Sequence, residues 1–239
     1  MTTEPSFHID DIRFRLAAAR RILHRGGCDS GVAGHVSARA EGEQAFWTSP
    51  MAYFDEALPT HAIKMGFDLS VIEGQMAIPG AMAFHSAIYK ARPEVNGIVH
   101  VHSRYVNVLT AAERTVGMYN ISSLIFHDEQ ALYVDSGDSP LREVGRIVTA
   151  LSQKRVVLMR HHGAIVVSSS LENATVDTLL LEEAARCHLE AQALGGSEIV
   201  DEKLIRTRRE NPYLRKLHWE ANLRRLERSD PDLYALLQR

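Results

Sequence analysis

The chain has 239 residues, 45% of them hydrophobic, so it can bury a full core, and one domain over residues 1–239 is the economical prediction. A formal net charge of −3 gives no electrostatic reason to expect nucleic acid or an anionic membrane as a partner, which leaves small molecules as the favoured ligands. Because Cys28 and Cys187 stand far apart, no apolar run approaches membrane-spanning length, and the N-terminus lacks the basic start and apolar stretch of a secretory signal, we expect a cytoplasmic protein without disulfides.

Apolar residues alternate between helical and strand-like spacing along the chain, and glycine or proline pairs mark the ends of the runs. The predicted elements in the first half are a helix over 12–24, a glycine-rich loop over 31–39, strands over 44–48, 62–65 and 70–72, and a helix over 81–90. The second half predicts a strand ending in His100 and His102, a helix over 105–113, a helix introduced by 137–140 and running to Leu151, strands over 155–159 and 164–167, and a long helix over 171–194. An α/β domain whose sheet is covered by helices is the interpretation that needs the fewest assumptions.

A charged tail follows, over residues 201–239. Trp219, Leu223 and Leu226 recur there at helical spacing. We therefore expect a helical tail that packs on the body of the domain or on another subunit.

Two histidines stand one residue apart at the end of an apolar run. In an extended strand, residues i and i+2 project from the same face, so His100 and His102 can offer imidazole nitrogens to one divalent ion, and a third histidine from a neighbouring strand would complete the set. A second histidine-rich strand is expected over 159–163. The alternative is a pair of ordinary polar residues on a half-exposed strand, but the apolar flanks favour burial, and buried imidazoles need partners.

Several of these motifs occur in a familiar order: Gly34-His35-Val36-Ser37-Ala38-Arg39, then Arg92-Pro93-Glu94-Val95, His100-Val101-His102-Ser103 and His162-Gly163. The chain resembles the class II aldolase/adducin family over roughly residues 12–195. The resemblance implies a three-layer α/β/α sandwich with a central mixed, largely antiparallel sheet. It also implies one divalent metal ion per subunit, with His162 as the third ligand beside His100 and His102, and a homo-oligomer, commonly a tetramer, with sites between subunits.

The chain departs from the sugar-phosphate aldolases of that family at two places. Where they carry Ser-Ser-Glu, this chain has Pro79-Gly80-Ala81, so the phosphate-holding serines and the acid/base glutamate are both missing. An alanine cannot move a proton at the carbon next to a carbonyl. In addition, His35 and His161 occupy positions where asparagine is usual in the family.

Decarboxylation keeps the metal and dispenses with proton abstraction from carbon, because loss of carbon dioxide itself leaves the carbanion. The family resemblance includes decarboxylases of hydroxylated aromatic dicarboxylates. We therefore expect a metal-dependent carboxy-lyase acting on a small-molecule carboxylate such as a dihydroxyphthalate, in aromatic-compound catabolism. The alternatives are a retro-aldol lyase for an unphosphorylated substrate, a non-haem iron oxygenase, and a non-enzymatic adducin-like binding module. Three histidines with open positions do not select among manganese, iron, zinc and cobalt.

Further residues are candidates for the site, each with a structural alternative. His85 and His161 are the catalytic candidates, although His85 also fits a satisfied core histidine. The substrate-binding candidates are His35, Ser37, Arg39, Ser49 and Tyr213. Arg39 suits two-pronged binding of a carboxylate or a structural salt bridge, the two serines suit turns or caps, and Tyr213 suits a neighbouring subunit's site or helix packing.

Overall fold

An eight-stranded mixed sheet runs through the middle of the computed structural model, which describes residues 6–135, 143–209, 211 and 213–237. The strands lie in the order β4-β3-β2-β1-β5-β8-β7-β6, and every neighbouring pair is antiparallel except β6 and β7. The strands are β1 (His35–Arg39), β2 (Ala45–Thr48), β3 (Ile63–Gly66), β4 (Val71–Glu73), β5 (Gly97–Val101), β6 (Gln130–Tyr133), β7 (Val156–Met159) and β8 (Gly163–Ser168).

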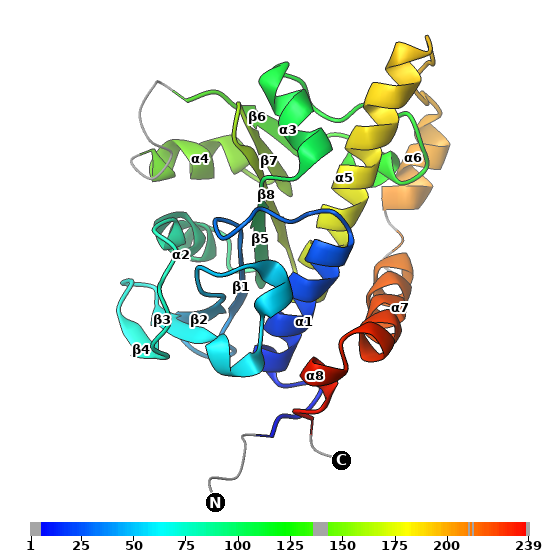
Figure 1. The fold of residues 1–239 in the computed structure, drawn as a ribbon. Helices are drawn as coiled ribbons and strands as arrows, with labels where there is room; N and C mark the ends of the chain where they lie inside the picture. Colours follow the sequence, from blue (N-terminus) through cyan, green and yellow to red (C-terminus); the bar gives the residue numbers. More distant parts are fainter. Residues whose placement is uncertain (1–5, 136–142, 210, 212, 238–239) are drawn as a thin grey trace, which may run out of the picture.

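Helices cover both faces of this sheet (Figure 1). The α-helices are α1 (Ile12–Arg25), α2 (Met82–Ala91), α3 (Arg104–Ala111), α4 (Val144–Leu151), α5 (Leu171–Ala193), α6 (Glu202–Arg209), α7 (Tyr213–Ser229) and α8 (Pro231–Tyr234), and three short 3-10 turns lie at Phe54–Glu56, Pro59–His61 and Ser123–Phe126. Helices α2 and α4 pack on one face, whereas α1, α3 and α5 pack on the other. The expected three-layer α/β/α sandwich with a largely antiparallel sheet is therefore confirmed.

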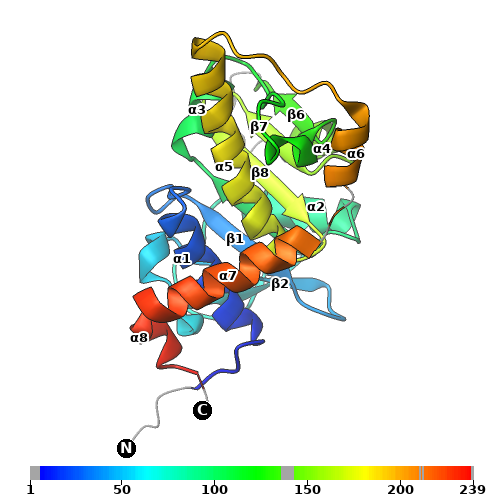
Figure 2. The ribbon, with the colours of Figure 1, turned by 90° about the vertical axis from the view of Figure 1, so that its right-hand side faces the viewer.

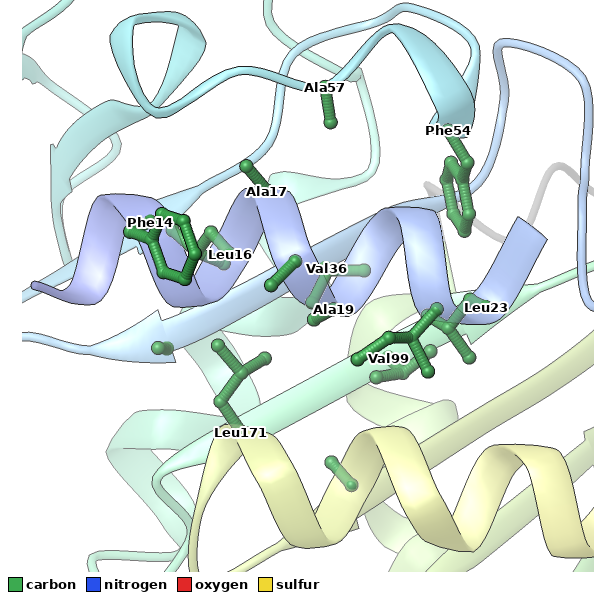
Figure 3. Close-up of a cluster of buried hydrophobic side chains, with 14 of the residues drawn as sticks. Phe14, Leu16, Ala17, Ala19, Leu23, Val36, Phe54, Ala57, Val99 and Leu171 are labelled. Atoms are coloured by element: carbon green, nitrogen blue, oxygen red, sulfur yellow. The ribbon is translucent and has the colours of Figure 1, made fainter. Parts of the chain in front are cut away.

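The central strands separate these two cores by simple alternation of side chains. Val36 on β1 and Val99 on β5 face α1, where they meet Ala19 and Leu23 (Figure 3). The residues between them in sequence point to the opposite face, toward α2. His35 and His100 are direct cross-strand partners, so both imidazoles lie on the α2 face.

The tail packs back onto the body of the molecule. Helix α7 lies across α1 and α5 (Figure 2), and Trp219 and Leu226 are buried in the same core as α1. The Arg215 guanidinium donates to the carboxylate of Asp177 on α5 at 2.6 Å. Of the two surfaces expected for the tail, the body of the domain is the one that the structure shows.

Most predicted elements appear within one or two residues of their expected ends, but three expectations were wrong. Residues 35–39 form the central strand β1 rather than a loop, because their alternate side chains are buried on both faces of the sheet. Residues 159–163 form a tight connection between β7 and β8 rather than a strand, and β6 was not predicted. The expected helix start at 137–140 lies outside the described residues. No described helix is both long and apolar enough to span a membrane.

Candidate metal centre

Three histidines from two parts of the chain converge at one end of the sheet. His100 lies on β5, His102 follows that strand directly, and His162 lies in the connection between β7 and β8. One ligand nitrogen from each lies within 4.8 Å of the other two. The imidazole ring centroids are 4.7 to 5.0 Å apart. The structure thus brings together the set that spacing and resemblance had indicated.

The position of His162 depends on the glycine beside it. Gly163 has a φ of +149°, and a Cβ built on it would lie 2.2 Å from the carbonyl oxygen of Val101. Only glycine permits this close approach of the β7–β8 connection to the end of β5. The approach carries His162 next to His102, whose ring would lie 3.0 Å from the same Cβ.

The ring of His100 is oriented by the strand beside it. Its Nδ1 lies 3.0 Å from the carbonyl oxygen of Ala164, which can only accept a hydrogen bond, so Nδ1 carries the hydrogen and the lone pair is on Nε2. That Nε2 lies 2.9 Å from the Nε2 of His102. Two ligands at right angles around an ion, each bonded at about 2.1 Å, would lie about 3.0 Å apart. The observed geometry therefore fits a bound divalent ion.

A buried carboxylate holds the segment that follows the two histidines. Glu182 on α5 accepts from Ser103 Oγ at 2.7 Å and from the backbone N–H groups of Tyr105 and Val106 at 2.9 and 3.0 Å. These N–H groups belong to the first turn of α3 and have no partner within the helix, so a carboxylate from another element caps it. On the other side, the backbone N–H of His102 donates to Ser30 Oγ at 2.6 Å.

Burial keeps the ligand imidazoles neutral. Desolvation holds the pKa of His100 well below its ordinary value and lowers the pKa of His102 to about 4. The pKa of His162 is also lowered by burial, against the opposing effect of Asp135. A neutral imidazole is the form that coordinates a metal, so the site is ready to bind an ion at neutral pH.

A line of buried polar side chains lies behind the three histidines. His35 Nδ1 is 2.7 Å from His85 Nε2, His85 Nδ1 is 2.6 Å from Ser37 Oγ, and that Oγ is 2.8 Å from the hydroxyl of Tyr89. The ring centroid of His35 is 4.7 Å from that of His100. His85 is completely buried with both nitrogens paired, so it reaches the metal centre only through His35.

The remaining predicted residues are not brought to this centre. Arg39 lies four residues along β1 from His35, roughly 13 Å away, and its guanidinium donates to the carbonyl oxygens of Val95, Tyr89 and Arg92. It is thus a structural residue with backbone partners, rather than the carboxylate binder or salt bridge we expected. Ser49 is buried and accepts from the backbone N–H of Val36 at 3.1 Å, which is the structural role allowed for it.

Two predicted residues keep open roles. His161 is exposed and has a φ of +54°, a conformation that asparagine adopts more readily than most residues. The side chain of Tyr213 lies outside the described residues. Ala81 directly precedes α2 and offers no side-chain cap to it, so no acid/base group occupies the position of the aldolases' glutamate.

Sequence reasoning missed three residues that shape the site. Tyr89 stands one helical turn after His85, a spacing that could have paired them. Glu182 and Arg20 carried no local signal. Arg20 is buried, its Nη2 donates to the carbonyl oxygens of Ala52 and Tyr53, and burial lowers its pKa to about 10. Its positive charge helps to lower the pKa of His35, although burial is the larger cause.

The fold and this histidine centre are those of a known family of proteins. Residues 14–189 match the family described as Class II Aldolase and Adducin N-terminal domain, and the chain belongs to it. Class II aldolases are typically dependent on divalent metals, and His100, His102 and His162 could bind one here.

Relatives of the chain differ in what they do. It is 28% identical over 239 residues to the 4-hydroxy-3-prenylphenylpyruvate oxygenase/4-hydroxy-3-prenylbenzoate synthase of Streptomyces roseochromogenus, with 94% of this chain and 85% of that protein covered. It is 28% identical over 202 residues to the decarboxylase NovR of Streptomyces niveus, covering 82% and 75%. It is 24% identical over 204 residues to the 3,4-dihydroxyphthalate decarboxylase of Arthrobacter keyseri, covering 77% and 80%.

Solved structures agree on the fold. An aldolase II superfamily protein from Pseudomonas syringae superimposes with a TM-score of 0.83 at 27% identity, covering 93% of this chain and 94% of that one. L-fuculose 1-phosphate aldolase from Glaciozyma antarctica superimposes with a TM-score of 0.82, also at 27% identity, covering 93% and 90%.

Proposed function

We propose that this protein is a metal-dependent decarboxylase of a small hydroxylated aromatic carboxylate, such as a dihydroxyphthalate. One observation carries the proposal: the three-histidine centre is intact, whereas Ala81 stands where the aldolases have their acid/base glutamate. Two relatives named as decarboxylases support the choice among the activities of the family.

The proposed chemistry assigns roles to residues of this chain. His100, His102 and His162 hold the ion, which supplies stabilisation for the negative charge left when carbon dioxide departs. His35, beside His100, offers a polar contact for a carboxylate or phenolate oxygen of the substrate. The ring carbon that loses carbon dioxide must gain a proton, and the exposed His161, next to a ligand in sequence, is the proposed donor.

The test is carbon dioxide release from 3,4-dihydroxyphthalate under anaerobic conditions, with manganese, zinc, cobalt or ferrous iron supplied in turn. We expect release that requires a metal and is abolished in His102→Ala. Release equal to the spontaneous rate with every metal, from protein shown to contain the metal, would contradict the proposal.

A non-haem iron oxygenase is the second candidate, because the relative covering 94% of this chain is named as an oxygenase. Three neutral imidazoles leave coordination positions open, as oxygen chemistry requires. Consumption of oxygen with ferrous iron and a hydroxyarylpyruvate, and no anaerobic turnover, would favour it. Formation of an aldehyde from an unphosphorylated hydroxy-carbonyl substrate would instead indicate a retro-aldol lyase.

We further propose that the protein is one domain, acts in the cytoplasm in aromatic catabolism, and forms a homo-oligomer, with a tetramer as the expected state. Exposed apolar side chains on the loops near the centre support self-association, with Val32, Met51 and Tyr53 each at least 41% exposed. Light scattering coupled to size-exclusion chromatography tests the subunit number.

A further inference from the structure

The line of polar side chains behind the metal centre is set by two spacings in the sequence. His35 and Ser37 are two residues apart on β1, so both point to the α2 face, and His85 and Tyr89 are one turn apart on α2. The four side chains meet between the two elements, and each is at most 1% exposed. Solvent therefore does not complete their hydrogen bonds.

Counting hydrogens gives this line a direction. Tyr89 carries one hydroxyl hydrogen, and among the described residues Ser37 Oγ is the only acceptor within hydrogen-bond distance of it. Leaving a buried O–H without an acceptor is costly, so Tyr89 donates to Ser37. The single hydrogen of Ser37 then goes to Nδ1 of His85, at 2.6 Å.

The two histidines follow from this. With Nδ1 accepting, neutral His85 carries its hydrogen on Nε2 and donates it to Nδ1 of His35, at 2.7 Å. Neutral His35 must then carry its own hydrogen on Nε2. The opposite direction would leave the Tyr89 hydroxyl hydrogen without an acceptor in a buried position.

We propose that this line fixes His35 as an Nε2–H donor at the edge of the metal centre, aimed at an anionic oxygen of the ligand. Nε2 of His35 has no hydrogen-bond partner within the described part of the chain, although the residue is only 1% exposed. A ligand carboxylate or phenolate oxygen would supply the missing acceptor. The ligand class rests on the proposed function, but the placement of the hydrogens does not.

Ser37 and His85 are therefore positioning residues. Ser37→Ala and Tyr89→Phe form a matched pair, because each removes one hydroxyl oxygen from the same buried line. In Tyr89→Phe, Ser37 still needs His85 Nδ1 as its acceptor, so the direction stays. In Ser37→Ala, His85 Nδ1 has lost its donor, and the two tautomers of His85 and of His35 become comparable in energy.

Neutron diffraction from deuterium-exchanged crystals of the full chain locates these hydrogens directly. We expect deuterium on Nε2 of both His35 and His85 in the wild type and in Tyr89→Phe, and on both nitrogens at partial occupancy in Ser37→Ala. Deuterium on Nδ1 of His35 in the wild type would overturn the inference, even if the protein decarboxylates its substrate.

Binding of phthalate, measured by calorimetry with zinc present, tests the consequence. We expect Ser37→Ala to weaken binding roughly fivefold, within the range for a hydrogen bond to a charged group, and Tyr89→Phe to change it less than about twofold. Equal weakening in both variants would indicate a packing role and overturn the assignment. Deuterium on Nε2 without any binding of phthalate by the wild type would uphold the hydrogen placement and count against the proposed substrate class.

Discussion

Nδ1 of His100 on β5 lies 3.0 Å from the carbonyl oxygen of Ala164 on β8, its antiparallel neighbour. A backbone carbonyl cannot change its hydrogen-bonding role, so it holds the imidazole with Nε2 directed away from the strand pair and toward His102. The sheet itself thus prepares one ligand of the proposed ion, and four predictions test the centre built on it.

Loss of a ligand should reduce bound metal. We expect His102→Ala to lower the zinc content, measured by elemental mass spectrometry after dialysis, from about one ion per chain to near zero, because two imidazoles alone bind zinc much more weakly. His161→Asn is the control, since asparagine tolerates the positive φ at that position and the side chain is exposed. Metal loss in His161→Asn equal to that in His102→Ala would count against the ligand assignment.

A methyl group at Gly163 should damage both stability and metal binding. Its Cβ would lie 2.2 Å from the Val101 carbonyl oxygen, so β5 and the β7–β8 connection must move apart. We expect Gly163→Ala to lower the free energy of unfolding in urea by about 3 kcal/mol or more.

Gly42→Ala is the matched control for that substitution. Gly42 also has a positive φ, of +72°, but nothing lies within 4 Å of its Cβ position, so it should lose only about 1 kcal/mol. Similar losses in the two variants would show that close packing at Gly163 is unimportant.

Removal of the Glu182 carboxylate should loosen the segment after His102. Glu182→Ala leaves Ser103 Oγ and two backbone N–H groups of α3 without their acceptor, and we expect a loss of about 2–4 kcal/mol in the free energy of unfolding together with weaker zinc binding. Glu182→Gln keeps the shape and one acceptor oxygen, so its loss should be about half as large. A zinc affinity unchanged in Glu182→Ala would show that this cap does not position the ligands.

The metal-free protein should lose stability as the pH falls below about 6.5. Burial lowers the pKa of His35, His85 and His100 well below 6.5 and that of His102 to about 4, so the unfolded chain binds more protons than the folded chain below pH 6.5. Their contribution is fully present above that pH and is lost progressively toward pH 4.

Urea unfolding at a series of pH values measures this slope. His85→Gln removes one titrating group, so its slope between pH 6.5 and 4.5 should be shallower by about 1.4 kcal/mol per pH unit. A wild-type stability that is flat across this window would mean that the imidazoles are not buried as described.

The pairing of His100 with His102 could be predicted from the sequence, because alternation along a strand is a local property that two residues and their apolar flanks reveal. The helix over 171–194 was likewise predictable from spacing and its flanking residues. The metal-site assignment of His162 came from resemblance, since nothing local distinguishes it from His161.

Tertiary structure alone decided how the second layer of the site is built. The stretch beginning at His35 was expected to be a loop, because its glycines are a local signal, whereas its place between β2 and β5 depends on partners elsewhere in the chain. The contact between His35 and His85 joins residues 50 positions apart, and Glu182 reaches Ser103 from 79 positions away. Sequence spacing gives the direction of a side chain within its own element, but hydrogen-bond partners are set by how strands and helices pack, and that packing gives each histidine its role.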